Sequence, residues 1–122
     1  MSYLMQYALR PTSAGRTRRG ARVDERLFLN RPKFDGGACV RVFVEDTSGR
    51  AHRFRRTPPA PRFRLRITDC AHEVNLEFSV DSAERRENSL FKIETLLGAL
   101  TRFRDGLAAE ADLYAERELQ RR

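Results

Sequence analysis

The chain has 122 residues, of which 40% are hydrophobic and 34% are charged, and its formal net charge at pH 7 is +7. A chain of this length forms one domain with a modest core, and it has no apolar run near the roughly 20 residues that span a bilayer. These features exclude an array of large domains and an integral membrane protein. Because residues 1–15 lack a charged and then apolar leader, we expect a cytoplasmic protein.

The positive charge is unevenly distributed along the chain. Residues 1–35 carry a net charge of +5, residues 36–82 carry +2, and residues 83–122 are neutral. Of the 24 basic residues, all but Lys33 and Lys92 are arginine. A basic balance of this kind indicates phosphate-rich partners, although a GC-rich coding sequence would favour arginine in the same way.

The N-terminal segment is predicted to be an arm. Residues 8–22 have no apolar period and are rich in glycine, serine, threonine and arginine. Such a segment buries too little surface to offset its ordering entropy, so residues 1–25 are expected to form a flexible basic arm. The sequence "RLFLN", residues 26–30, is a candidate for a short fifth strand at the start of a single domain over 26–122.

Residues 38–80 predict a four-stranded antiparallel meander. Residues 38–45 and 62–68 alternate apolar and polar side chains, which is typical of half-buried strands, and residues 50–56 and 73–80 supply the other two. The loop "TSG" predicts a hairpin that pairs Val44 with His52 and Val42 with Phe54. A register shifted by one residue would bury arginines among valines.

The second predicted hairpin sets the partners of three arginines. Its register places Arg62 opposite Ser79, Arg64 opposite Glu77 and Arg66 opposite Asn75, and it also places Thr68 opposite Glu73. Opposite charges on facing strands attract each other. We therefore expect Arg64 to be neutralised, and Arg62 and Arg66 to lack a carboxylate partner.

The last third of the chain predicts one long helix over about 82–121. Asp81 and Glu84 resemble a capping box. Apolar residues then recur at helical spacing, which predicts a helix with a broad apolar face that packs on one face of the sheet. The members of this stripe are Leu90, Ile93, Leu97, Leu100, Phe103 and Leu107. The expected fold class is α+β, with a four- or five-stranded antiparallel sheet and a long C-terminal helix.

The outer face of the predicted sheet is rich in arginine and carries an aromatic ring. Guanidinium groups bind phosphates and an exposed ring stacks on a base, a combination used by single-strand binders. We therefore expect non-enzymatic binding of single-stranded DNA or RNA. The architecture is similar to that of small single-strand-binding coactivator, Whirly and PUR-type domains, which pair through their helices. The expected binding residues are Arg41, Phe43, Arg53, Arg55, Arg62, Arg64 and Arg66 on the sheet, with Arg16, Arg18 and Arg19 on the arm.

Three alternatives remain open at this stage. The same face is equally explained as a solvated surface of Arg–Glu pairs, because Glu45, Glu73 and Glu77 share it. A protein–protein assembly module would act through the C-terminal helix, with Leu113, Tyr114 and Leu119 as contacts and a homodimer as product. An enzyme is less favoured, and its candidate residues are Cys70, His72 and Glu73.

No cofactor or metal is expected. The potential zinc ligands Cys39, His52, Cys70 and His72 lack the paired spacing of a structural zinc site.

Overall fold

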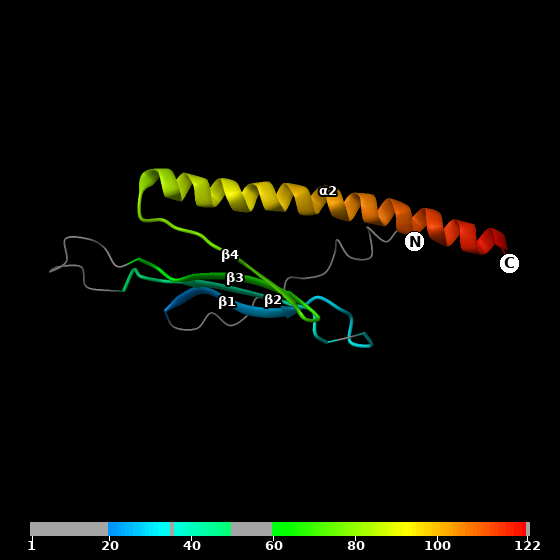
Figure 1. The fold of residues 1–122 in the computed structure, drawn as a ribbon, viewed down its shortest axis with the longest axis horizontal. Helices are drawn as coiled ribbons and strands as arrows, with labels where there is room; N and C mark the ends of the chain where they lie inside the picture. The colour runs from blue at the N-terminus through cyan, green and yellow to red at the C-terminus, as the bar shows by residue number, and fades with distance from the viewer. Residues whose placement is uncertain (1–19, 35, 50–59, 122) are drawn as a thin grey trace. The chain divides into compact units, whose positions relative to one another are not determined.

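The computed structural model describes residues 20–34, 36–49 and 60–121. Four strands precede one helix: β1 (Ala21–Phe28), β2 (Cys39–Glu45), β3 (Phe63–Asp69), β4 (His72–Leu76) and α2 (Ala83–Arg121) (Figure 1). This confirms the predicted α+β class, with a four-stranded antiparallel sheet and a long C-terminal helix. Of the described residues, those up to Arg86 and those of the helix from Glu87 onward belong to separate compact units, so each unit is described by itself, and the packing of α2 on the sheet stays a prediction.

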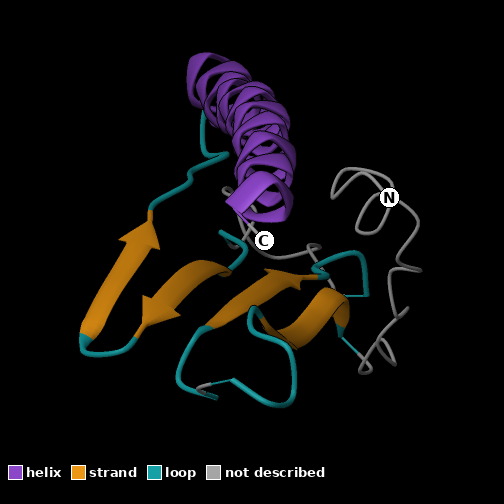
Figure 2. Ribbon diagram, turned by 90° about the vertical axis from the view of Figure 1, so that its right-hand side faces the viewer, coloured by secondary structure: helices purple, strands orange, loops and turns teal. Residues whose placement is uncertain are grey.

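The sheet is a simple meander, in which β1, β2, β3 and β4 lie side by side in chain order and every neighbouring pair is antiparallel (Figure 2). The first strand differs from the expectation. β1 starts at Ala21, so residues 21–25, assigned above to the flexible arm, are part of the sheet. The adjacent Asp24 and Glu25 interrupt the alternation, and this is why the sequence pattern did not show the whole strand.

The predicted hairpin between residues 38–45 and 50–56 is wrong. Both edges of β2 are occupied, one by β1 and the other by β3, so that Val42 lies opposite both Glu25 and Leu65. Val44 likewise lies opposite Val23 and Phe63 and not opposite His52. Residues 50–59 lie outside the described parts of the chain.

The predicted register between β3 and β4 is confirmed, with Arg66 opposite Asn75 and Thr68 opposite Glu73. The turn is tighter than expected, because Asp69 already pairs with His72. Cys70 takes a positive φ of 53° to make this turn, a conformation that non-glycine residues adopt rarely.

Strand alternation gives the sheet two chemically different faces. One face is largely apolar, with Val40, Val42 and Val44 of β2 opposite Ile67, Leu65 and Phe63 of β3. The other face carries Arg41 and Phe43 opposite Arg66 and Arg64. The apolar face is only half-buried, and no large side chain in the described residues is fully buried.

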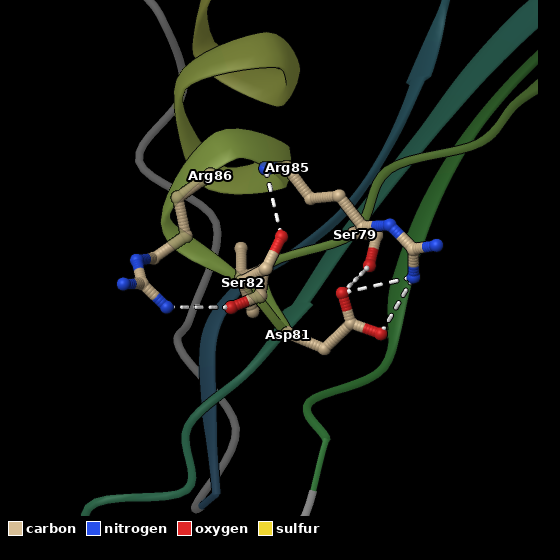
Figure 3. Close-up of polar contacts among 6 residues, drawn as sticks. Ser79, Asp81, Ser82, Arg85 and Arg86 are labelled. Carbon is tan, nitrogen blue, oxygen red and sulfur yellow. Dashed lines mark hydrogen bonds and ion pairs between the residues drawn. The ribbon is translucent and has the colours of Figure 1, made fainter.

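The N-terminus of α2 is capped by Ser82, one residue later than predicted (Figure 3). Its hydroxyl accepts a hydrogen bond from the backbone N–H of Arg85 at 3.1 Å, and its carbonyl accepts one from the N–H of Arg86 at 2.9 Å. Asp81 is not the cap, because its carboxylate accepts hydrogen bonds from the Ser79 hydroxyl at 3.0 Å and the Arg85 guanidinium at 2.9 Å.

These two donors hold the pKa of Asp81 below its usual value, with the Ser79 hydroxyl contributing more than Arg85. A lowered carboxyl pKa means that the folded state prefers the charged form. Asp81 therefore stabilises the fold above the pKa of an unfolded aspartate, and this contribution disappears as the pH falls through its lowered pKa.

The Ser82 cap leads to a first prediction. Ser82→Ala removes the acceptor for the Arg85 N–H and should lower the free energy of unfolding by about 1 kcal/mol. Ser82→Asp restores an equally good cap next to the positive end of the helix dipole and should retain the wild-type value. Chemical unfolding followed by far-ultraviolet circular dichroism measures both. Equal stability of the alanine and aspartate variants would contradict this role of Ser82.

Candidate nucleic-acid interface

The polar face of the sheet gathers arginines from three adjacent strands. Arg26 of β1 lies opposite Arg41 of β2, which in turn lies opposite Arg66 of β3. Arg62 precedes β3, and Arg64 lies within it, at the alternate positions before Arg66. The structure thus brings together four of the predicted binding arginines, Arg41, Arg62, Arg64 and Arg66, and adds Arg26. The predicted residues Arg16, Arg18, Arg19, Arg53 and Arg55 lie outside the described residues.

Arg62 is tied to Glu45, which contradicts the expectation that it lacks a partner. The Glu45 carboxylate binds the Arg62 guanidinium through Nη2 at 3.2 Å and Nε at 3.2 Å, and accepts its backbone N–H at 3.2 Å. The N–H of Glu45 in turn donates to the carbonyl of Arg62 at 2.9 Å. Because β2 pairs directly with β3, Glu45 lies across from Arg62, which the predicted strand order did not allow.

Arg66 also has a carboxylate partner, against the expectation. Its Nε lies 3.1 Å from Glu73 Oε1 and donates to the Asn75 side chain at 3.0 Å. Asn75 faces Arg66 directly, whereas Glu73 is the diagonal neighbour on the same face of β4. The long arginine side chain spans this diagonal, a reach that cross-strand geometry allows.

Arg64 does not form the ion pair with Glu77 that the sequence predicts. Strand β4 ends at Leu76, opposite Leu65, so the ladder stops before the predicted pair of Arg64 with Glu77. Within the described parts of the chain, Arg64 forms no ion pair. The arginine predicted to be neutralised is therefore available, and the two predicted to be available are paired.

Two phenylalanines lie on the polar face. Phe43, the predicted stacking residue, is half-buried, and the guanidinium carbon of Arg62 lies 5.8 Å from its ring centroid. A base would have to compete with Arg62 for that position. Phe28, two residues after Arg26 on β1, is 62% exposed, and the Arg26 guanidinium carbon lies 5.4 Å from its ring centroid. Sequence reasoning missed Phe28 because it treated residues 26–30 only as a candidate strand and did not specify the pairing with β2 that fixes the face of this ring.

Arg22 of the edge strand β1 is also neutralised, by a carboxylate that directly follows β2. Arg22 lies 3.3 Å from the Asp46 carboxylate. The pKa of Asp46 is lowered, mainly by hydrogen bonds from Ser48, whose N–H donates at 2.9 Å, with a smaller contribution from Arg22. Among the residues that the structure describes, the arginines of this face with no ion pair are Arg26, Arg41 and Arg64.

The catalytic alternative gains no geometric support from the hairpin that contains its residues. His72 lies opposite Asp69 and Glu73 opposite Thr68, so these two side chains point to opposite faces of β4. Cys70 is exposed in the turn and forms no disulfide. Across residues 20–34, 36–49 and 60–121, no three His, Cys, Asp or Glu side chains are placed to hold a metal ion. Nor does that part of the chain contain a helix with the length and apolar character needed to cross a bilayer.

Comparison of the chain with protein-family models, curated proteins and solved structures finds no match. The arrangement of charged and aromatic side chains on the sheet is therefore the basis for assigning a function.

The Glu45–Arg62 pair leads to a second prediction. Arg62 is 77% exposed, so Arg62→Ala should lower the free energy of unfolding by less than about 1 kcal/mol. Glu45 is 7% exposed and accepts the backbone N–H of Arg62 as well, so Glu45→Ala should cost about 1–3 kcal/mol. Denaturant unfolding of the two variants tests this asymmetry. A larger loss in Arg62→Ala than in Glu45→Ala would show that Glu45 does not anchor the end of β2.

Proposed function

We propose that this protein binds single-stranded nucleic acid on the polar face of its sheet, without chemistry. The observation that carries the proposal is the set of unpaired guanidinium groups on adjacent strands, Arg26, Arg41 and Arg64, next to the exposed ring of Phe28. Guanidinium groups bind phosphate oxygens bidentately, and an aromatic ring stacks on a base of any sequence.

The remaining arginines of the face have a different role in this proposal. Arg62 and Arg66 are held by Glu45 and Glu73 and fix the shape of the face. Their carboxylate partners also reduce its charge, so the three unpaired arginines contribute most of the affinity. Because neighbouring strands lie about 4.8 Å apart, these guanidinium groups are close enough to contact successive phosphates of one strand.

A salt series with labelled single-stranded oligonucleotides tests the function. Binding of the full chain should weaken steeply with salt, because each neutralised phosphate contributes about −0.7 to the slope of log affinity against log salt concentration. Arg64→Glu should weaken binding at least tenfold at low salt. It should also reduce the magnitude of that slope by about 0.7, the contribution of one phosphate contact. Fluorescence anisotropy measures both quantities.

The matched control is Arg117→Glu, which makes the same charge change at an exposed position of α2. It should leave the affinity within about twofold of wild type, since the change lies outside the proposed interface. Absence of oligonucleotide binding at low salt, or equal losses in the two variants, would exclude the sheet face as the binding surface.

A second function, assembly through α2, is favoured by a separate observation. The apolar stripe along the first half of the helix is exposed, with Leu90, Leu97, Leu100, Phe103 and Leu107 each between 52% and 69% accessible. Residues 90, 93, 97 and 100 follow the three-and-four spacing by which helices pack against one another, and residues 107 and 114 continue it at seven-residue intervals. Of the contacts expected from sequence, Tyr114 lies on this stripe and Leu119 lies beside it, about 20° around the helix axis from Leu90, whereas Leu113 lies on the opposite side of the helix.

We infer that a second copy of this chain covers the stripe, in place of the packing on the sheet that the apolar period predicts. Helix α2 carries seven basic and eight acidic residues, so two copies of it do not repel each other strongly. Like helices with matching apolar seams associate side by side, and the apolar area removed from water drives that association.

Sedimentation or light scattering tests the assembly. The wild-type chain should have twice the mass of one chain at micromolar concentration, and the double variant Leu97→Asp with Leu100→Asp should be monomeric. Ala109 is not part of the stripe either, so Ala109→Asp with Leu113→Asp introduces the same charge on the opposite side of the helix and should remain dimeric. A monomeric wild-type protein, or dissociation of both variants alike, would argue against pairing through this stripe.

A further inference from the structure

The row of arginines opposite one another on three strands borders a hollow of about 300 Å³. Arg26, Arg41 and Arg66 line it from the sheet, and Gly36 and Gly37 line it from the loop that joins β1 to β2. Its volume corresponds to about ten water molecules, which is more than one phosphate group needs. All of these residues belong to the same compact unit of the chain.

The charge of the lining is strongly unbalanced. Three guanidinium groups contribute +3, and Glu73, the one carboxylate in the lining, contributes −1, so the hollow has a formal charge of +2. Glu73 is bound to Arg66 at the β4 side. Arg26 lies near the Phe28 ring at the β1 side. The central Arg41 is exposed and forms no ion pair in the described parts of the chain.

Three like charges in direct cross-strand register destabilise a sheet unless something compensates them. Arg66 is bound to Glu73 and Arg26 lies over the Phe28 ring, but Arg41 has no such local partner in the described residues. A doubly charged anion between the guanidinium groups would offset the repulsion and match the net charge of the lining.

The glycine loop gives the hollow an accessible wall. The loop is closed at its base by a hydrogen bond from the Leu29 N–H to the Ala38 carbonyl at 2.9 Å. Gly36 has open space around its α-carbon, since a methyl group added there would contact nothing within 4 Å. Without side chains, Gly36 and Gly37 leave the backbone approachable by an anion, as glycines do in phosphate-binding loops.

We propose that this hollow is a binding site for a single phosphate group, coordinated by Arg26, Arg41 and Arg66. The proposal rests on the proposed function and makes it more specific, since it names where one phosphate of a bound strand is anchored. The phosphate has two potential sources, an internal phosphodiester of a nucleic acid and a terminal or free phosphate. Both present the same oxygens to the arginines.

Inorganic phosphate is the first probe, titrated into the full chain labelled with ¹⁵N while amide resonances are recorded. We expect saturable shifts of the Gly36 and Gly37 amides, with chloride at equal ionic strength producing none. Arg41→Gln should weaken the phosphate affinity at least tenfold. The matched control Arg117→Gln, which removes the same charge at an exposed position of α2, should leave it unchanged. The absence of saturable shifts, or shifts that Arg41→Gln does not affect, would overturn the site.

Competition by oligonucleotides with and without a 5′-phosphate then identifies the source. Displacement of phosphate by both supports an internal phosphodiester, and displacement by the phosphorylated form alone supports a terminal phosphate. An oligonucleotide that binds in an Arg64-dependent way without displacing phosphate overturns the site and leaves the proposed function standing. Saturable phosphate binding without any oligonucleotide binding overturns the proposed function and supports a free-anion site.

Discussion

The register between β2 and β3 is the constraint on which the polar face depends. Burying Val40, Val42 and Val44 together with Ile67, Leu65 and Phe63 requires these residues to lie opposite one another. Because side chains alternate between faces, the same register places the arginines of the two strands opposite one another, and a shift by one residue would expose the apolar set. The cluster of like charges is thus a direct consequence of apolar pairing, and β1 extends it through Arg26.

Carboxylates then divide the arginines of this face into two groups. Glu45 is the buried charged residue in the described part of the chain, and it binds both the backbone and the guanidinium of Arg62. Glu73, on the edge strand β4, binds the guanidinium of Arg66. These pairs fix positions and reduce the field of the sheet, whereas the unpaired arginines remain available to an anion. A negatively charged partner would therefore meet a preorganised surface, because it can bind the unpaired arginines without first breaking existing ion pairs.

The exposed apolar stripe of α2 is a second constraint, because leaving apolar surface in contact with water is unfavourable. A chain of this size is stable only if it removes a large part of its apolar surface from water, yet in the described residues no large side chain is fully buried. Self-association through the helix would supply the missing burial. A dimer would also carry two arginine surfaces, and linked weak contacts raise the overall affinity without any new interaction. The two proposed functions are therefore compatible.

The sequence by itself determined the local features of this protein. Alternation identified the strands at 39–45 and 63–69 and their inward and outward faces, the β3–β4 register followed from the short turn, and the apolar period identified the long helix. Only the tertiary structure decided that β1, and not residues 50–56, is the other neighbour of β2. The physical reason is that alternation specifies which way a side chain points but not which strand lies beside it. The pairing of Arg62 with Glu45, and the alignment of Arg26 with Arg41 and Arg66, depend on that choice of neighbours.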